Sequence, residues 1–349
     1  LENQFGLYFR KWLVDAGLFK ENANPTTNEV NVYANSMQRC IATANYFKTA
    51  LFPVGDVKVN HRFVPSKMDP VFFPRLTKTS KSFKAQALKE IAAMGGKKGI
   101  VGINEDLKEC YEITAKVLDL KNSPACKQDN LCAFDNYNTQ IILEKGDEPR
   151  MKGSLKDANT CSDALILQYY EEPDTKKAAF GHNITLTDWT KIAKIKDVYG
   201  DVLFAAPTVA VNVAHPLLVY MYDELSDKDR KLSFLCGHDS NIASVTAALE
   251  VEPYDLPNSI EKKTPIGCKL VFEKFEGKDG QMYCDINLTY QSTDQLRNIA
   301  MLSLNNPPQI FPIALKGLQK NADGLYLLND VKARFMKAIR AYDKIEDDF

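Results

Sequence analysis

The amino-acid sequence predicts an α/β fold that carries an inserted, mainly α-helical cap. Short apolar strands alternate with helices in residues 1–53 and 203–349, which is the pattern of a central sheet flanked by helices. Residues 54–202 show helical periodicity interrupted by polar loops. With 349 residues the chain also exceeds a typical single core. We therefore expect an α/β domain formed by 1–53 and 203–349, and an α-helical cap domain over 54–202.

The first predicted strand leads directly into a helix. Alternating apolar residues predict a strand over 30–34, Asn35-Ser36 a helix cap, and apolar periodicity a helix that continues through Phe47. Arg39 then lies in the first helical turn, where a cation works against the helix dipole unless an anion is also bound. Its guanidinium suits the oxygens of a phosphate. Taken alone, Arg39 is better explained as a surface residue than as a ligand.

The middle of the chain contributes the helices of the predicted cap. The helical periodicity covers Ser82–Ala93, Leu107–Val117, Asp163–Tyr170 and Trp189–Ile195. The run Gly95-Gly-Lys-Lys-Gly99 lacks the spacing of a phosphate-binding loop, and no strand precedes it, so we interpret it as a solvated turn. His61-Arg62 falls on an exposed segment that leads into the cap. A cap over the strand edges would form one wall of a pocket, because open α/β sheets bind ligands outside the carboxyl ends of their strands.

The last third of the chain returns to the sheet pattern. Apolar runs predict strands over Lys231–Cys236, Cys268–Phe275 and Met282–Thr289. A terminal helix is marked by the apolar positions Val331, Phe335, Ile339 and Tyr342. His215-Pro216 has no acidic or cysteine partner nearby and is interpreted as a packing or helix-entry position.

The strongest candidate for chemistry is Gly237-His238-Asp239, where the 231–236 strand stops and a helical pattern begins. A helix that starts at the carboxyl edge of a buried strand offers unpaired backbone N–H groups and a positive dipole end to an anion. His238 can donate to a phosphoryl oxygen, and Asp239 can carry a proton. The alternative is a purely structural helix cap, because Asp and Ser are ordinary residues at that position.

Together these segments resemble the histidine acid phosphatases, most closely the bacterial glucose-1-phosphatases. The resemblance covers nearly the whole chain, and its segments occur in the family's order. They are Tyr33-Ala-Asn-Ser-Met-Gln-Arg39, Met68-Asp-Pro70, Ser123-Pro-Ala-Cys126, Leu167-Gln-Tyr-Tyr-Glu171, Gly237-His-Asp-Ser-Asn-Ile-Ala-Ser244, Thr264-Pro-Ile-Gly267, Tyr290-Gln-Ser292 and Gln295-Leu-Arg-Asn298.

This resemblance implies a phosphomonoesterase that works through a phosphohistidine. In the family a histidine attacks phosphorus, arginines and a second histidine hold the phosphate oxygens, and an aspartic acid protonates the leaving oxygen. By position, Arg39 and His238 become phosphate ligands and Asp239 the proton donor. A carboxyl group beside a bound dianion is pushed toward its protonated form, which suits that role and an acidic working pH. The resemblance implies no metal and no cofactor, because Arg and His supply the positive charge.

One part of the family pattern is missing. The attacking histidine of the family lies in an Arg-His-Gly or Arg-His-Asn motif on the first strand, and neither motif occurs in this sequence. By resemblance, residues 1–13 correspond to the helix after that strand, so we expect the chain to begin within a domain and to be a truncated, inactive form of an active enzyme. Loss of a central strand would leave unpaired backbone groups on its neighbours. Two alternatives are a natural non-catalytic relative that binds sugar phosphates and a phosphotransferase similar to phosphoglycerate mutase.

The expected substrate is a small phosphorylated molecule. Glu171 holds the place of a glutamate that lies near the sugar in the glucose-1-phosphatases. An acidic side chain accepts hydrogen bonds from sugar hydroxyls and repels polyphosphorylated ligands, which favours a sugar phosphate such as glucose 1-phosphate over phytate. The alternative for Glu171 is an exposed acid at a helix end.

The cysteines indicate where the protein works. Cys126 and Cys132 match a small disulfide loop of the family, so we expect a bridge there and hence a periplasmic or secreted protein. Cys40, Cys161, Cys236, Cys268 and Cys284 are interpreted as small core residues, and Cys110 is left open. The spacing of the cysteines and histidines does not fit a zinc site.

The charge pattern narrows the range of partners. Acidic and basic residues are nearly balanced and evenly spread, without a basic stripe, so nucleic acid is not an expected partner. No apolar run approaches the roughly twenty residues that cross a bilayer, so no membrane partner is expected. The oligomeric state is left open.

Overall fold

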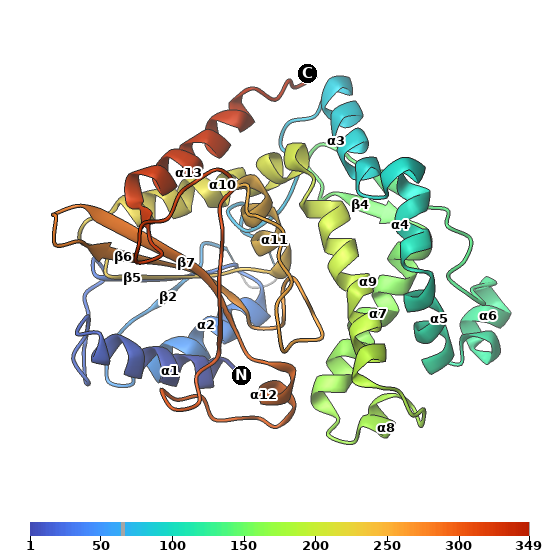
Figure 1. The fold of residues 1–349 in the computed structure, drawn as a ribbon, viewed down its shortest axis with the longest axis horizontal. Coiled ribbons are helices and arrows are strands. Elements are labelled where there is room, and N and C mark those ends of the chain that lie inside the picture. Colours follow the sequence, from blue (N-terminus) through green and yellow to red (C-terminus); the bar gives the residue numbers. More distant parts are fainter. Residues whose placement is uncertain (64–66, 349) are drawn as a thin grey trace.

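The computed structural model describes residues 1–63 and 67–348. Figure 1 shows the order of its elements along the chain. The helices are α1 (Glu2–Asp15), α2 (Gln38–Leu51), α3 (Lys81–Ala93), α4 (Ile100–Asp106), α5 (Lys108–Val117), α6 (Pro124–Asp129), α7 (Ser154–Glu171), α8 (Thr175–Ala178), α9 (Leu186–Phe204), α10 (Pro207–Ser226), α11 (Asp239–Ala248), α12 (Thr293–Arg297) and α13 (Leu328–Asp343), with short 3-10 turns at Gly96–Lys98 and Leu120–Asn122. The strands are β1 (Val30–Ala34), β2 (Val59–Asn60), β3 (Gln140–Ile142), β4 (Arg150–Lys152), β5 (Leu232–Cys236), β6 (Lys269–Glu276), β7 (Met282–Tyr290), β8 (Gln309–Pro312) and β9 (Tyr326–Leu327).

A parallel sheet in the order β2-β1-β5 lies at the centre of the α/β part, which confirms the predicted fold class. Strands β1 and β5 pair over their whole length, from Val30 opposite Leu232 to Ala34 opposite Cys236. Side chains alternate across β1: Val32 packs with α1 and α2, whereas Tyr33 packs against the cluster that includes α10. Both faces of β1 are therefore buried, as a parallel strand between two helical layers requires.

The remaining strands of the α/β part form a second, antiparallel sheet in the order β6-β7-β8, with β9 also paired to β7. Among the described residues, β5 is hydrogen-bonded only to β1, and β6 only to β7. The strands predicted from the sequence over 231–236, 268–275 and 282–289 agree with β5, β6 and β7 to within one residue at each end. The sequence pattern did not reveal that they divide between two sheets.

Helices α10 and α13 cover the face of these sheets opposite α1 and α2. Leu217 and Leu218 of α10 share one core with Leu288 of β7 and Phe335 of α13. Within α10 the His215 ring stacks on Tyr342 of α13, with ring centroids 3.8 Å apart. The packing interpretation of His215-Pro216 is thus correct and the helix-entry interpretation is wrong, because α10 begins at Pro207 and Pro216 lies in its interior.

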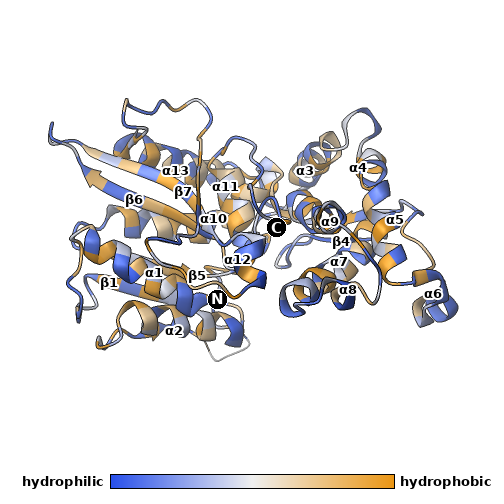
Figure 2. Ribbon diagram, turned by 60° about the horizontal axis from the view of Figure 1, so that its bottom comes forward, coloured by the Kyte–Doolittle hydropathy of each residue, from blue (hydrophilic) through white to orange (hydrophobic). Residues whose placement is uncertain are grey.

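The helices α3 to α9 gather beside the α/β part and have cores of their own (Figure 2). In one of these cores Trp189 of α9 stacks on Tyr169 of α7, with centroids 4.2 Å apart. Helices α7 and α9 are longer than the predicted 163–170 and 189–195, because polar residues on their buried faces, such as Ser162 and Asp197, interrupt the apolar periodicity. Helix α9 ends at Phe204 and α10 begins at Pro207 after a bend of 83°. The domain boundaries predicted for the cap, at residues 54 and 202, stay a prediction.

No single helix in the described ranges is long and apolar enough to cross a membrane. Helices α9 and α10 pass such a test only when taken together across their bend.

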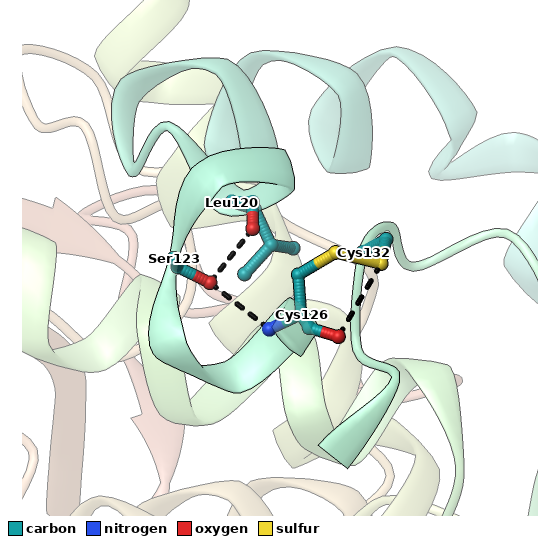
Figure 3. The surroundings of a disulfide bond; sticks show 4 residues. All are labelled: Leu120, Ser123, Cys126 and Cys132. Atoms are coloured by element: carbon teal, nitrogen blue, oxygen red, sulfur yellow. Dashed lines mark hydrogen bonds between the residues drawn. A yellow bond between two sulfur atoms is a disulfide. The ribbon is translucent and has the colours of Figure 1, made fainter. Parts of the chain in front are cut away.

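The predicted disulfide between Cys126 and Cys132 is present (Figure 3). Ser123 caps α6 by accepting a hydrogen bond from the Cys126 amide, so the bridge closes a short capped turn. The expectation of core positions holds for Cys40, Cys236 and Cys284, and Cys110 is buried as well. It is wrong for Cys161 and Cys268, which are only partly buried because each lies at the edge of a packed cluster.

Candidate active site

The parallel pairing of β1 and β5 brings two distant segments of the sequence to one edge of the sheet. Because Ala34 lies opposite Cys236, the chain leaves both strands at the same level. Helix α2 begins just beyond β1 and α11 just beyond β5, so Arg39 of α2 meets His238 at the start of α11. Arg39 NH2 lies 3.3 Å from His238 Nδ1. The structure therefore brings together two of the residues predicted to hold phosphate.

The predicted cap Asn35-Ser36 is wrong, because Met37 occupies the N-cap position of α2, and its side chain makes no capping hydrogen bond. Asn35 and Ser36 are fully buried and serve neighbouring segments. The Ser36 hydroxyl accepts a hydrogen bond from the Phe63 amide. Asn35 is placed between His238 and the segment that contains Asp69.

Asn35 fixes the orientation of the His238 ring. The Asp69 backbone N–H donates to Asn35 Oδ1 at 2.9 Å, which identifies that atom as the oxygen of the amide. The amide nitrogen of Asn35 then faces His238 Nε2 at 2.7 Å. Since an amide nitrogen only donates, Nε2 must accept, and the ring proton of His238 sits on Nδ1.

This assignment leaves two donors facing each other. Arg39 NH2 and the Nδ1–H of His238 point into the same space, and neither can accept from the other. An anionic oxygen beside the two nitrogens, at about 2.8 Å from each, would accept from both. Two helix N-termini, those of α2 and α11, add unpaired N–H groups and positive dipole ends at the same edge. The arrangement is that of an anion site suited to phosphate.

Asp69 anchors the segment behind Asn35. Its carboxylate is fully buried and accepts hydrogen bonds from the Tyr33 hydroxyl, the Arg62 guanidinium and the Val71 amide. Burial alone would raise the pKa of Asp69, but the hydrogen bonds from Arg62 and Tyr33 outweigh it and lower that pKa. The sequence analysis placed Arg62 on an exposed segment and gave it no partner. In the structure its charge pairs with the buried carboxylate of Asp69.

Asp239 directly follows His238 as the first residue of α11 and is open to solvent, with 55 % of its side chain exposed. Lys196 of α9 approaches it, with Nζ 3.5 Å from Asp239 Oδ2. The same ammonium group pairs with the buried Glu261 at 2.7 Å, and Glu261 in turn accepts from the Tyr170 hydroxyl of α7. Burial lowers the pKa of Lys196, but Glu261 and Asp239 outweigh this effect and raise it.

Two further acids, Glu148 and Asp163, lie near Asp239, and burial raises the pKa of each. A cleft of about 780 Å³ opens beside them, and its lining includes Asp163, Lys196 and Asp239. Arg39 and His238 are not part of that lining. The cleft thus adjoins Asp239, whereas the Arg39–His238 pair lies outside its lining.

Glu171 is not brought into contact with the anion site. It is the last residue of α7 and is exposed, and it makes no hydrogen bond or ion pair within residues 1–63 and 67–348. The end of α7 is nevertheless held in place, because Arg297 donates to the carbonyls of Tyr169 and Pro173 and stacks on the Tyr169 ring. The predicted role of Glu171 near a sugar stays a prediction.

The other three histidines lie elsewhere. His61 contacts the Phe63 carbonyl, His182 follows α8 at the surface, and His215 packs between α10 and α13. No group of three or more His, Cys, Asp or Glu side chains in the described part of the chain has the geometry of a metal site.

Comparison with known proteins defines the class to which this fold and site belong. Residues 2–294 match the histidine phosphatase superfamily (branch 2), so the chain belongs to the histidine acid phosphatases. The resemblance inferred from the sequence is confirmed.

Among individual proteins, the chain is 39 % identical to a glucose-1-phosphatase of Providencia rettgeri over 346 residues, which covers 97 % of this chain and 81 % of the relative. It is 38 % identical to a glucose-1-phosphatase of Salmonella typhimurium over 329 residues, covering 93 % and 78 %. A solved phytase of Hafnia alvei in its apo form has the same fold, with a TM-score of 0.86, 25 % identity, and coverage of 98 % of this chain and 87 % of the phytase.

Proposed function

We propose that this protein is an acid phosphomonoesterase for sugar phosphates such as glucose 1-phosphate. The observation that carries the proposal is the pair of facing donors, Arg39 NH2 and His238 Nδ1, at the meeting point of two helix N-termini. Both groups donate to the nonbridging oxygens of a phosphate monoester, and their hydrogen bonds strengthen as negative charge grows in the transition state.

Asp239 is proposed as the proton donor to the leaving oxygen. It directly follows His238 in the chain and is exposed to solvent, so it can exchange its proton between turnovers. The cleft beside Asp239 accepts the alcohol part of the substrate, since the leaving oxygen must lie next to its proton donor. Lys196 holds the Asp239 carboxyl group in place through its second contact with Glu261.

The chemistry also needs a nucleophilic histidine, and the 349 residues contain no Arg-His-Gly or Arg-His-Asn motif. In-frame sequencing of the gene upstream of Leu1 tests whether such a motif precedes them. An Arg-His-Gly or Arg-His-Asn motif there supports the phosphohistidine enzyme. A stop codon there overturns it and favours the alternative, a non-catalytic relative that binds sugar phosphates at the same site.

We further propose that the protein works in the periplasm or is secreted. The Cys126–Cys132 disulfide supports an oxidising compartment.

Binding and turnover test the proposed roles separately. We expect the 349-residue chain to bind inorganic phosphate in calorimetric titration, and Arg39→Ala to weaken that binding at least tenfold, because it removes a charged hydrogen bond. Lys48→Ala, in the last turn of the same helix, is the matched control and should bind as the unsubstituted chain does. Equal affinities for all three proteins contradict the phosphate site.

Turnover is measured on the complete gene product. Asp239→Asn should lower kcat for glucose 1-phosphate far more than it raises KM, since Asp239 acts in the chemical step.

Glu171→Ala should raise KM for glucose 1-phosphate more than for a small aryl phosphate, which has no sugar hydroxyls. Equal changes for the two substrates would remove Glu171 from the substrate pocket.

A further inference from the structure

Helix α9 contains a glycine that the helix itself does not explain. Gly200 lies in the interior of α9, which is continuous from Leu186 to Phe204. Glycine weakens a helix interior relative to alanine, because it loses more conformational freedom on folding. The reason for a glycine at this position must therefore lie in what surrounds it.

The other helical glycines are explained by close packing. Three glycines lie inside the described α-helices, namely Gly6, Gly102 and Gly200. A Cβ atom at Gly6 would collide with the Phe47 carbonyl of α2, and one at Gly102 with the Gly95 carbonyl. A Cβ atom at Gly200 would meet no heavy atom within 4 Å beyond its chain neighbours and the backbone of its own helix. Gly200 thus borders open space, and no tight contact requires it.

The space beside Gly200 belongs to the cleft next to Asp239. Gly200 lines this cleft together with Lys196 and Asp239. Lys196 precedes Gly200 by four residues, so the two positions lie on the same side of α9. A helical side chain leans toward the N-terminus of its helix, so a side chain at position 200 would extend over the turn that carries Lys196. Lys196 Nζ lies 3.5 Å from Asp239 Oδ2. The space that Gly200 leaves open is therefore close to the proposed proton donor.

The charges at this end of the cleft favour an uncharged ligand group with hydroxyls. Asp163 of α7 also lines the cleft, is exposed, and makes no hydrogen bond or ion pair with the residues that the structure describes. Its carboxylate can accept hydrogen bonds from hydroxyl groups. Lys196 is already paired with the buried Glu261, so Asp163 and Asp239 leave this end of the cleft negatively charged. A second phosphate would be repelled there, whereas a sugar would not.

We propose that Gly200 is a specificity-determining residue, because the side chain that it lacks leaves room beside Asp239 for the sugar ring of a sugar phosphate. This inference rests on the proposed function, in which the sugar departs with the oxygen that Asp239 protonates. The phosphate group is held at Arg39 and His238, which do not line the cleft. A larger side chain at position 200 should therefore weaken binding of a sugar phosphate and leave binding of a small phosphate analogue unchanged.

The experiment compares two ligands that share an anionic group and differ in size. They are methylphosphonate and the phosphonate analogue of glucose 1-phosphate, whose C–P bond is not hydrolysed. Calorimetric titration of the 349-residue chain measures both affinities. We expect Gly200→Leu to weaken binding of the glucose analogue about tenfold or more, through a clash in the cleft, and to leave the affinity for methylphosphonate within about twofold. Thr187→Leu places the same side chain on the exposed first turn of α9, outside the cleft lining, and should bind both ligands as the unsubstituted chain does.

Stability gives a second readout, which should move in the opposite direction. Gly200→Ala and Gly200→Leu should both unfold at a higher urea concentration than the unsubstituted chain, because alanine and leucine favour a helix more than glycine does. The shorter side chain of Gly200→Ala should weaken binding of the glucose analogue less than that of Gly200→Leu. A glycine required for packing would instead lower the urea midpoint in both variants.

The possible failures can be told apart. Unchanged binding of both ligands to Gly200→Leu overturns the role of Gly200 and leaves the phosphate site intact. Loss of both ligands in Gly200→Leu, or a lowered urea midpoint, contradicts a role confined to the sugar. If the unsubstituted chain binds neither ligand, the proposed function itself fails, and the inference about Gly200 fails with it.

Discussion

At the scale of single residues, the site depends on a side chain that touches no substrate. Asn35 accepts from the Asp69 backbone and donates to His238 Nε2, and this sets the tautomer in which Nδ1–H faces the anion site. Asn35 is a positioning residue of the proposed phosphate site, because it acts only through the imidazole ring of His238.

Asn35→Asp should reverse the tautomer of His238. A carboxylate accepts where the amide donated, so the ring proton moves to Nε2 and Nδ1 presents a lone pair to the anion. Phosphate affinity should fall about tenfold or more at pH 7.5, through loss of one charged hydrogen bond. Calorimetry measures the affinity, and the ¹⁵N shifts of the His238 ring report the tautomer. Asn45→Asp, on the exposed side of α2, is the control and should change neither. An unchanged ring spectrum in Asn35→Asp contradicts the positioning role.

The residues proposed to hold phosphate could be predicted from the sequence, whereas those that support them could not. Arg39 and His238 follow predicted strands directly, and parallel strands bring such positions together. Asn35 was misinterpreted as a cap because Asn before a helix is ordinarily one. The core assignment of Cys40 and Cys236 is confirmed, since burial is the common fate of a free cysteine.

At the scale of elements, the sequence predicts a helix or strand well where apolar periodicity spans it. Strand β7 and helix α3 agree with the predicted ranges to within a residue. Helices α7 and α9 extend well beyond theirs, and their buried polar side chains explain why: Ser162 donates to the Ile192 carbonyl, and Asp197 binds backbone amides. A polar residue on a buried face interrupts the pattern that would identify the helix.

Asp197 of α9 gives a measurable pH dependence of stability. Its carboxylate accepts from the Lys262 and Lys263 amides, and burial raises its pKa to about 7. The unfolded chain ionises this group near pH 4, so between about pH 4 and 7 the folded state holds the extra proton. The free energy of unfolding therefore falls as pH rises through that window, by at most about 1.4 kcal/mol per pH unit, and the effect levels off above pH 7.

Asp197→Asn should remove this contribution, because an amide does not titrate. Its one oxygen can still accept from the Lys262 amide, which forms the shorter of the two hydrogen bonds to this side chain. Urea unfolding at pH 6 and pH 7 gives the test, since the neighbouring Asp201, whose pKa burial raises to about 6, contributes mainly below that interval. We expect a smaller loss of stability across this interval than in the unsubstituted protein. Asp129→Asn, an exposed residue at the end of α6, serves as the control. Equal losses in all three proteins would rule out Asp197 as the titrating group.

At the scale of the whole molecule, the helices α3 to α9 meet the α/β part beside Asp239. The sequence predicted such a cap from helical periodicity alone, but it gave no signal for the charged contact that joins the two parts. Lys196 of α9 reaches Glu261, Asp239 and the Thr264 carbonyl, and Tyr170 of α7 adds a hydrogen bond to Glu261. Segments that occur far apart in the sequence thus share one buried ion pair, which only the folded chain reveals.

The Lys196–Glu261 ion pair should contribute little net stability, because burying both charges costs about as much as their attraction returns. Removal of one partner should nevertheless destabilise the protein strongly, since the other charge stays buried and unpaired. Glu261 is 1 % exposed, so Lys196→Met leaves a buried carboxylate without its cation and should destabilise the protein by about 3–5 kcal/mol. The double variant Lys196→Met/Glu261→Gln should recover most of that loss, because the amide oxygen still accepts from Tyr170 and no charge is left buried. Denaturant unfolding measures all three proteins, and Lys194→Met on the exposed side of α9 controls for loss of a lysine. A double variant as unstable as Lys196→Met would mean that the lysine acts through packing of its alkyl chain, and that charge does not hold the cap helices to the α/β part.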